Sequence, residues 1–181
     1  MKIVLVVAHT RSRPGAVNER TGLAEHDLSS TFVAMVDQQL AIRAPGIETV
    51  IIRRPEPNNH SEEVALINAH ADADVCASFH FNAFDKRTDG CEVLYWTTST
   101  RGFRLARGLQ DELARVLMNN PRGAKEIKDG DRGAYILRDT TMPCVLLEPA
   151  FIDSDADLAN FISKMPTVAT VVADQLAIAC L

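Results

Sequence analysis

The sequence predicts an α/β fold: a single domain with a mostly parallel, twisted sheet of about five to six strands and helices on both faces. Short apolar runs typical of buried strands alternate along the chain with longer stretches of helical periodicity, an order that indicates parallel strands covered by helices. The 181 residues are 46% hydrophobic. That length and composition suffice for one compact core, because a domain usually holds ~100–200 residues.

The amino-terminal half contains both kinds of pattern. In the first long periodic stretch, large apolar residues recur at near-helical spacing and mark a stripe that faces the core. This stripe consists of Leu28, Phe32, Val36 and Leu40. A second, shorter periodic stretch begins with Ser-x-Glu, which is typical of a helix start. In chain order we expect a strand at 2–8, a helix from about 23 to 43, a strand at 48–54, a short helix from 61 and a strand at 74–80.

The carboxyl-terminal half continues the alternation. A strand with partly alternating polarity is followed by an amphipathic helix, and a glycine-rich, charged segment then separates that helix from the last strands. Pro166 suits the first position of a new helix, so we expect two terminal helices rather than one. The predicted elements are a strand at 90–96, a helix at 102–118, a loop at 119–133, a short strand at 134–137, a buried strand at 143–148 and terminal helices within 155–180.

Charge and hydropathy exclude several classes of partner. The formal net charge is −5, and no run of basic residues exceeds the pair Arg53 and Arg54, so we expect no nucleic-acid partner. No apolar run approaches the ~18 residues of a membrane span. Only six apolar residues lie between Lys2 and His9, too few for a signal peptide. We therefore expect synthesis in the cytoplasm without a signal peptide, and no membrane insertion.

The cysteines do not indicate a metal or disulfide framework. They lie inside apolar runs without Cys-x-x-Cys spacing, and we interpret them as small buried hydrophobic residues. Cys76 and His80 share one predicted strand, where four residues span ~13 Å. One metal ion therefore cannot bind both. The four are Cys76, Cys91, Cys144 and Cys180.

Three predicted strands lead directly into residues that can bind a metal or carry a proton: His9, His80 and Glu148. The carboxyl ends of parallel strands meet at one edge of a sheet, so these side chains can converge there. Glu25 belongs to the apolar stripe of the first helix, where a carboxylate is costly unless it is paired or metal-bound. Its alternative role is to complement the helix dipole. Two imidazoles and a carboxylate, with one position left to water, are the parts of a hydrolytic zinc site.

Three segments, AHTRSRPGAVNERTGLAEHDLSS, SFHFNAFDKRTDGCEVLYW and DRGAYILRDTTMPCVLLEPAFIDSDADL, resemble the signature blocks of zinc-dependent N-acetylmuramoyl-L-alanine amidases of the amidase-3 type. Such enzymes occur among bacterial cell-wall hydrolases and phage endolysins. The resemblance covers nearly the whole chain in the family's order. It implies that His9, Glu25 and His80 bind Zn²⁺ and that Glu148 is the catalytic carboxylate. The implied reaction cleaves peptidoglycan between N-acetylmuramic acid and the L-alanine of the stem peptide.

The chain departs from the family pattern at three places. Ala8 and Thr10 flank His9 where the family usually has glycines, and Ser154 stands where Asn is common. Some members insert a regulatory helix after the second histidine, but here only nine residues separate His80 from Gly90. That interval has no room for the helix, so we expect no obligatory activator.

Three further residues are candidates for supporting roles. Asn82 is expected to orient a loop or a neighbour of the ligands rather than to bind substrate itself. Arg132 and Arg138 precede the last buried strand and are candidates for contacts with peptide carboxylates. Their alternative is the ordinary one for arginines in loops, a solvated side chain.

Two other functions are compatible with this sequence. A zinc-dependent peptidase or deacylase acting on a different amide would need the same metal site, and an inactive wall-binding module would keep the fold. We expect residues 1–181 to form one catalytic domain without a separate wall-binding domain.

The expected biological role is host lysis by a phage endolysin that reaches the periplasmic wall after a holin opens the membrane. A bacterial enzyme exported by another route and a cytosolic recycling enzyme are the alternatives.

Overall fold

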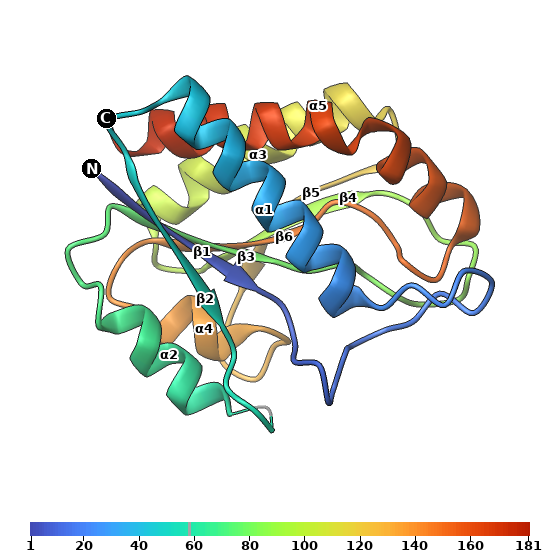
Figure 1. The fold of residues 1–181 in the computed structure, drawn as a ribbon, viewed down its shortest axis with the longest axis horizontal. Helices are drawn as coiled ribbons and strands as arrows, with labels where there is room; N and C mark the ends of the chain where they lie inside the picture. The colour runs from blue at the N-terminus through green and yellow to red at the C-terminus, as the bar shows by residue number, and fades with distance from the viewer. Residues whose placement is uncertain (58) are drawn as a thin grey trace.

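A computed structural model describes residues 1–57 and 59–181, and within them six strands form one sheet in the order β2-β1-β3-β6-β4-β5 (Figure 1). All neighbouring pairs are parallel except β4 and β6. The predicted α/β class and mostly parallel sheet are confirmed. The strands are β1 (Lys2–Val7), β2 (Glu48–Arg53), β3 (Val75–Phe79), β4 (Cys91–Trp96), β5 (Pro121–Ile127) and β6 (Cys144–Glu148).

Helices cover both faces of the sheet, as predicted. In Figure 1, α1, α3 and α5 lie on one side, and α2 and α4 on the other. Alternate strand residues face the two layers: Leu5 packs in the cluster with the first group of helices, whereas Val4 packs in the cluster with the second. The helices are α1 (Glu25–Arg43), α2 (His60–Asn68), α3 (Thr100–Leu117), α4 (Ala134–Asp139) and α5 (Asp155–Ala179).

The one antiparallel pair has a simple cause. The segment 80–90, which joins β3 to β4, is shorter than the dozen or more residues that a parallel crossover needs. The chain therefore turns back, and β4 runs antiparallel to β6, which has inserted between β3 and β4. Among the described residues, no helix combines the length and the apolar character required to cross a bilayer.

Two predictions in the region 119–139 were wrong. Residues 121–127 form the edge strand β5 rather than a loop, and residues 134–137 belong to helix α4 rather than to a strand. An edge strand needs to bury little of its surface, so β5 lacks an apolar alternation that the sequence could reveal. The run of four apolar residues in α4, 134–137, is too short to separate a helix from a strand by periodicity.

The carboxyl-terminal helix is continuous, against the prediction of two helices that meet at Pro166. Pro166 lies inside α5, and its own side chain is exposed, so water can satisfy the carbonyl group that loses its partner. Phe161 before the proline and Val168 after it are both fully buried in the same core cluster. Packing on both sides of Pro166 keeps the helix intact.

The core beneath α1 contains an aromatic cluster. Phe32 contacts Phe79 and Phe161 edge to face, with ring centroids 5.4 and 5.2 Å apart. All three side chains are fully buried. The cluster joins α1, β3 and α5, the elements that surround the carboxyl edge of the sheet.

We expect Phe32→Ala to lower the free energy of unfolding by about 3–5 kcal/mol, because it removes a fully buried ring and leaves a cavity. Phe84→Ala is the matched control, since the side chain of Phe84 is 80% exposed; its effect should stay within about 0.5 kcal/mol. Urea unfolding of both variants and the parent measures the difference. Equal losses would contradict this account of the core.

Candidate functional site

The carboxyl edge of the sheet brings the four residues predicted from the sequence into one region. His9 follows the end of β1 by two residues, and His80 comes directly after β3. Glu148 is the last residue of β6, and Glu25 is the first residue of α1. His9 has a left-handed backbone with φ of 61°, which is uncommon for a residue other than glycine. The loop bends sharply at this residue.

The Glu25 carboxylate connects the two imidazoles. Its Oε2 lies 2.9 Å from His9 Nε2, and its Oε1 lies 3.0 Å from His80 Nδ1. Glu25 also accepts hydrogen bonds from the backbone N–H groups of Ala16 and Phe81. Burial opposes ionisation of this carboxyl group, but hydrogen bonds from His80 and His9 outweigh burial and hold the pKa of Glu25 well below its usual range.

The residues His9, Glu25 and His80 fit a bound metal ion. They each offer one ligand atom, and these atoms all lie within 4.8 Å of one another. Two imidazole nitrogens and a carboxylate oxygen form a donor set suited to a divalent transition metal. Burial lowers the pKa of His80, which favours the neutral imidazole that binds metals. The cluster thus suggests a metal ion.

Gly15 closes over this cluster and leaves no room for a side chain. A Cβ atom at this position would lie 2.5 Å from Glu25 Oε2 and 2.7 Å from His9 Nε2. The backbone of Gly15 is also left-handed, with φ of 79°, a conformation that glycine adopts without strain. The loop can therefore approach the ligand atoms closely only because residue 15 is glycine.

Ser29 and His26, on the first turns of α1, hold the two histidine segments in place. The Ser29 hydroxyl donates to the carbonyl oxygen of Phe79 at 2.7 Å and accepts from the N–H of Ala8 at 3.0 Å. His26 Nδ1 lies 3.0 Å from the carbonyl oxygen of Ala8. These contacts fix the residues that precede His9 and His80. Sequence reasoning did not identify Ser29.

Glu148 is almost completely buried, with 2% of its surface exposed. Its Oε1 accepts a hydrogen bond of 2.9 Å from Arg132 Nη2, whereas its Oε2 has no partner among the described residues. Burial raises the pKa of Glu148 well above its usual range, Arg132 opposes that rise, and the charges of Glu25 and Glu92 add to it. A buried carboxyl group of this kind is a candidate to accept and donate a proton.

Asn82 lies between Arg132 and Glu92 and hydrogen-bonds to both, and its orienting role stays a prediction. Its Oδ1 accepts from Arg132 Nη2 at 3.1 Å, and its Nδ2 donates to Glu92 Oε1 at 2.8 Å. Arg122 holds the other carboxylate oxygen of Glu92 at 2.9 Å. Sequence reasoning missed Glu92. Its position on the same strand face as the buried Leu94 was an available signal, because a carboxylate on a buried face needs a partner.

A cavity of about 350 Å³ joins the metal cluster to Glu148, and Arg132 lies in its wall. Arg138 does not line this cavity; it is half-exposed and pairs with Asp129 and Asp139. The wall also contains three residues that sequence reasoning missed: Arg54, His60 and Tyr135. A larger cavity of about 610 Å³ lies near Met1 and Leu181 and contains none of the residues of the metal cluster.

Comparison with known proteins agrees with this geometry. The family model Amidase_3, N-acetylmuramoyl-L-alanine amidase, matches residues 3–178. The amidase LytC of Bacillus subtilis is 31% identical over 155 residues, which cover 84% of this chain and 29% of that protein. The germination-specific N-acetylmuramoyl-L-alanine amidase of the same species is 32% identical over 97 residues, which cover 53% of this chain and 39% of that protein. The chain thus spans less than half the length of these curated relatives.

Solved structures share the fold. The catalytic domain of the CD27L endolysin, which targets Clostridia difficile, superposes with a TM-score of 0.82 at 24% identity, covering 97% of this chain and 96% of that chain. Cwp6 from Clostridium difficile gives a TM-score of 0.83 at 24% identity, covering 96% of this chain and 28% of that chain. The match of the family model over almost the whole chain confirms the resemblance found in the three sequence segments. The chain belongs to the N-acetylmuramoyl-L-alanine amidase family.

Proposed function

We propose that this chain hydrolyses the amide bond between N-acetylmuramic acid and the L-alanine of the peptidoglycan stem peptide, with a zinc ion bound by His9, Glu25 and His80. The observation that carries the proposal is one cavity that holds both a metal-type cluster and a buried carboxyl group with a raised pKa, Glu148. Family membership supports the substrate.

The donor set supports zinc, which commonly takes imidazole and carboxylate ligands and leaves one position open in catalytic sites. When bound, zinc supplies a water of lowered pKa and polarises the scissile carbonyl group. In this reaction Glu148 would take a proton from the attacking water and pass it to the departing amine of L-alanine. Arg132 holds Glu148 Oε1, so the unpartnered Oε2 is the oxygen that carries the proton.

Other amide substrates are possible, because a zinc-dependent peptidase or deacylase would use the same metal ligands and the same proton carrier. Mass analysis of digested peptidoglycan separates these activities. The proposed reaction frees the amino group of L-alanine and leaves the glycan strands intact. Cleavage between two amino acids, or release of acetate, would show a different reaction. An inactive wall-binding module is the third reading, and the presence of all four site residues disfavours it.

Two narrower expectations accompany the proposal. Within the described residues 80–90, no helix is present between His80 and Gly90, which supports activity without an activating partner. The role in host lysis stays a prediction, since the proteins similar to this chain include both an endolysin and bacterial amidases.

We expect His80→Ala to abolish stoichiometric zinc binding, because it removes one of three ligands. His70→Ala is the matched control, since His70 lies beyond the end of α2 and does not line the cavity. Elemental analysis of the purified proteins by mass spectrometry measures zinc per chain. Full zinc content in His80→Ala would show that the proposed ligand set is wrong.

Glu148→Gln should retain zinc and the fold while activity falls by ~10²–10⁴-fold, the usual contribution of a positioned proton carrier. The amide is nearly isosteric with the carboxyl group but cannot transfer the proton. Initial rates on purified peptidoglycan, together with zinc content and melting temperature, test this expectation. Loss of zinc would make Glu148 a ligand, and turnover near the parent value would make it structural.

Arg132→Met should move the acidic limb of the pH profile of kcat/KM to higher pH. Arg132 lowers the pKa of Glu148, so its removal raises that pKa, and the base must be ionised to accept a proton. The displacement should shrink at high salt, because the side chain of Arg132 is 61% exposed. Arg115→Met, on the distant helix α3, serves as control. An unchanged limb, or one moved to lower pH, contradicts the assignment.

A further inference from the structure

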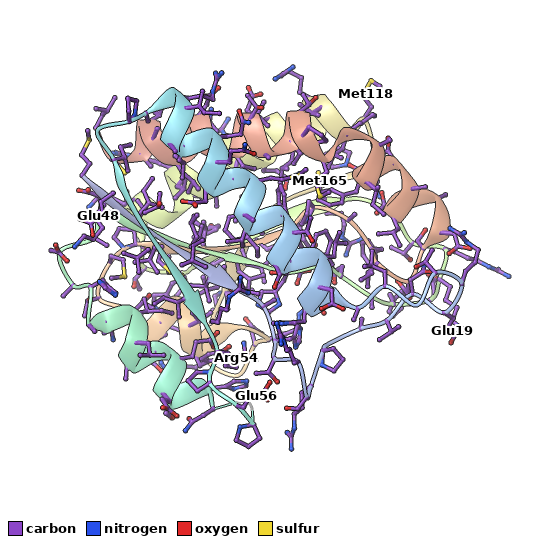
Figure 2. The ribbon with its side chains drawn as sticks, viewed as in Figure 1. Glu19, Glu48, Arg54, Glu56, Met118 and Met165 are labelled. Carbon is purple, nitrogen blue, oxygen red and sulfur yellow. The ribbon has the colours of Figure 1, made fainter. Side chains whose placement is uncertain are left out.

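One wall of the cavity is built on a buried ion pair. Arg54 directly follows β2 (Figure 2), and its side chain is only 3% exposed. Its Nε donates to Glu63 Oε2 at 2.9 Å, and its Nη2 donates to the Tyr135 hydroxyl at 2.7 Å. The same hydroxyl donates to Glu63 Oε2 at 2.9 Å. Glu63 is fully buried.

A pair of this kind is weak support for stability, because burying two charges costs about as much as their attraction returns. Its effect on the cavity is clearer. Glu63 compensates the charge of Arg54, so this wall adds no net charge. The pair also holds the ring of Tyr135, on which His60 stacks with ring centroids 4.3 Å apart and planes 3° from parallel.

The contacts of His60 determine which of its nitrogens carries the proton. Its Nε2 lies 3.3 Å from Arg54 Nη1, and a guanidinium group can only donate. Nε2 is therefore the acceptor, and in the neutral ring the proton is on Nδ1. Desolvation, followed by the charge of Arg54, lowers the pKa of His60, which favours this neutral form. Among the described residues, Nδ1 has no hydrogen-bond partner.

His60 lines the same cavity as His80 and Glu148. We infer that His60 contacts the substrate and donates a hydrogen bond from Nδ1 to an amide carbonyl oxygen of the muramoyl peptide, an inference that rests on the proposed function. The wall offers an uncharged donor beside a compensated arginine, which suits a neutral oxygen. A carboxylate of the stem peptide would instead pair with Arg132, the cation that lines another part of this cavity.

Three substitutions of His60 separate the donor from the ring. His60→Phe keeps a flat ring on Tyr135 and removes the N–H group. His60→Asn places an amide N–H near the position of Nδ1, and His60→Gln places it near Nε2, toward Arg54. We expect kcat/KM on a soluble muramoyl peptide to fall about three- to tenfold in His60→Phe and His60→Gln, the loss of one hydrogen bond. His60→Asn should stay within about twofold of the parent.

Zinc content and melting temperature should stay at the parent values, and His70→Phe, outside the cavity, is the matched control. If His60→Phe is less stable than the parent, the comparison of His60→Asn with His60→Gln decides whether the Nδ1 donor contributes. Values of kcat/KM near the parent in both His60→Phe and His60→Gln would overturn the inference. Equal losses in His60→Asn and His60→Gln would also overturn it, because they would assign the effect to the ring rather than to Nδ1.

A binding measurement separates this inference from the proposed function. Calorimetric titration of the Glu148→Gln protein with N-acetylmuramoyl-L-alanyl-D-isoglutamine reports binding without turnover. Adding His60→Phe to this protein should weaken binding about three- to tenfold, and adding His60→Asn should restore it. A parent protein that hydrolyses no muramoyl amide would sink the proposed function alone, while this titration would still decide the role of His60. No difference among the three proteins would overturn the inference.

Discussion

The whole site depends on the buried carboxylate of Glu25. It joins a loop, a helix start and a strand end that are far apart in sequence, through His9, His80 and the N–H groups of Ala16 and Phe81. A carboxylate without such partners could not stay charged in this position, because desolvation costs several kcal/mol. The partners therefore stabilise the charge, and the charge holds the two imidazoles at the separation a metal needs. This arrangement requires glycine at position 15, since the side chain of any larger residue would collide with Glu25 and His9.

Two carboxyl groups share the cavity but are held in opposite states. Hydrogen bonds from two imidazoles lower the pKa of Glu25, while burial beside other acidic groups raises the pKa of Glu148. Such a divergence supports the proposed roles: a group that stays ionised suits a metal ligand, and a group that exchanges its proton suits an acid and base. Arg132 moderates the second group without neutralising it, because Arg132 is largely exposed.

The residues of the metal cluster could be predicted from the sequence, because each follows an apolar run that must be buried or belongs to a buried helical stripe. The cavity wall formed by Arg54, His60 and Tyr135 could not be predicted in this way. His60 begins a short helix and is exposed, so its local pattern is that of an ordinary solvated residue. Only its contact with Arg54 in the folded chain fixes Nδ1 as the ring nitrogen that carries the proton. The edge strand β5 escaped prediction for the opposite reason, since it makes few apolar contacts that would pattern its sequence.

The short link between β3 and β4 affects the chemistry as well as the topology. Because β4 runs antiparallel to β6, the beginning of β4 lies against the end of β6, and Glu92 is the register partner of Glu148. A parallel β4 would instead bring its own end, at Tyr95 and Trp96, to this position. The reversal therefore places a second carboxylate beside Glu148, where its charge helps to raise the pKa of that residue. Asn82, within the link itself, donates to Glu92 and accepts from Arg132. The short link that excludes a crossover helix thus reverses β4 and so places Glu92 beside Glu148. The link itself supplies Asn82, the side chain that holds Glu92 in place.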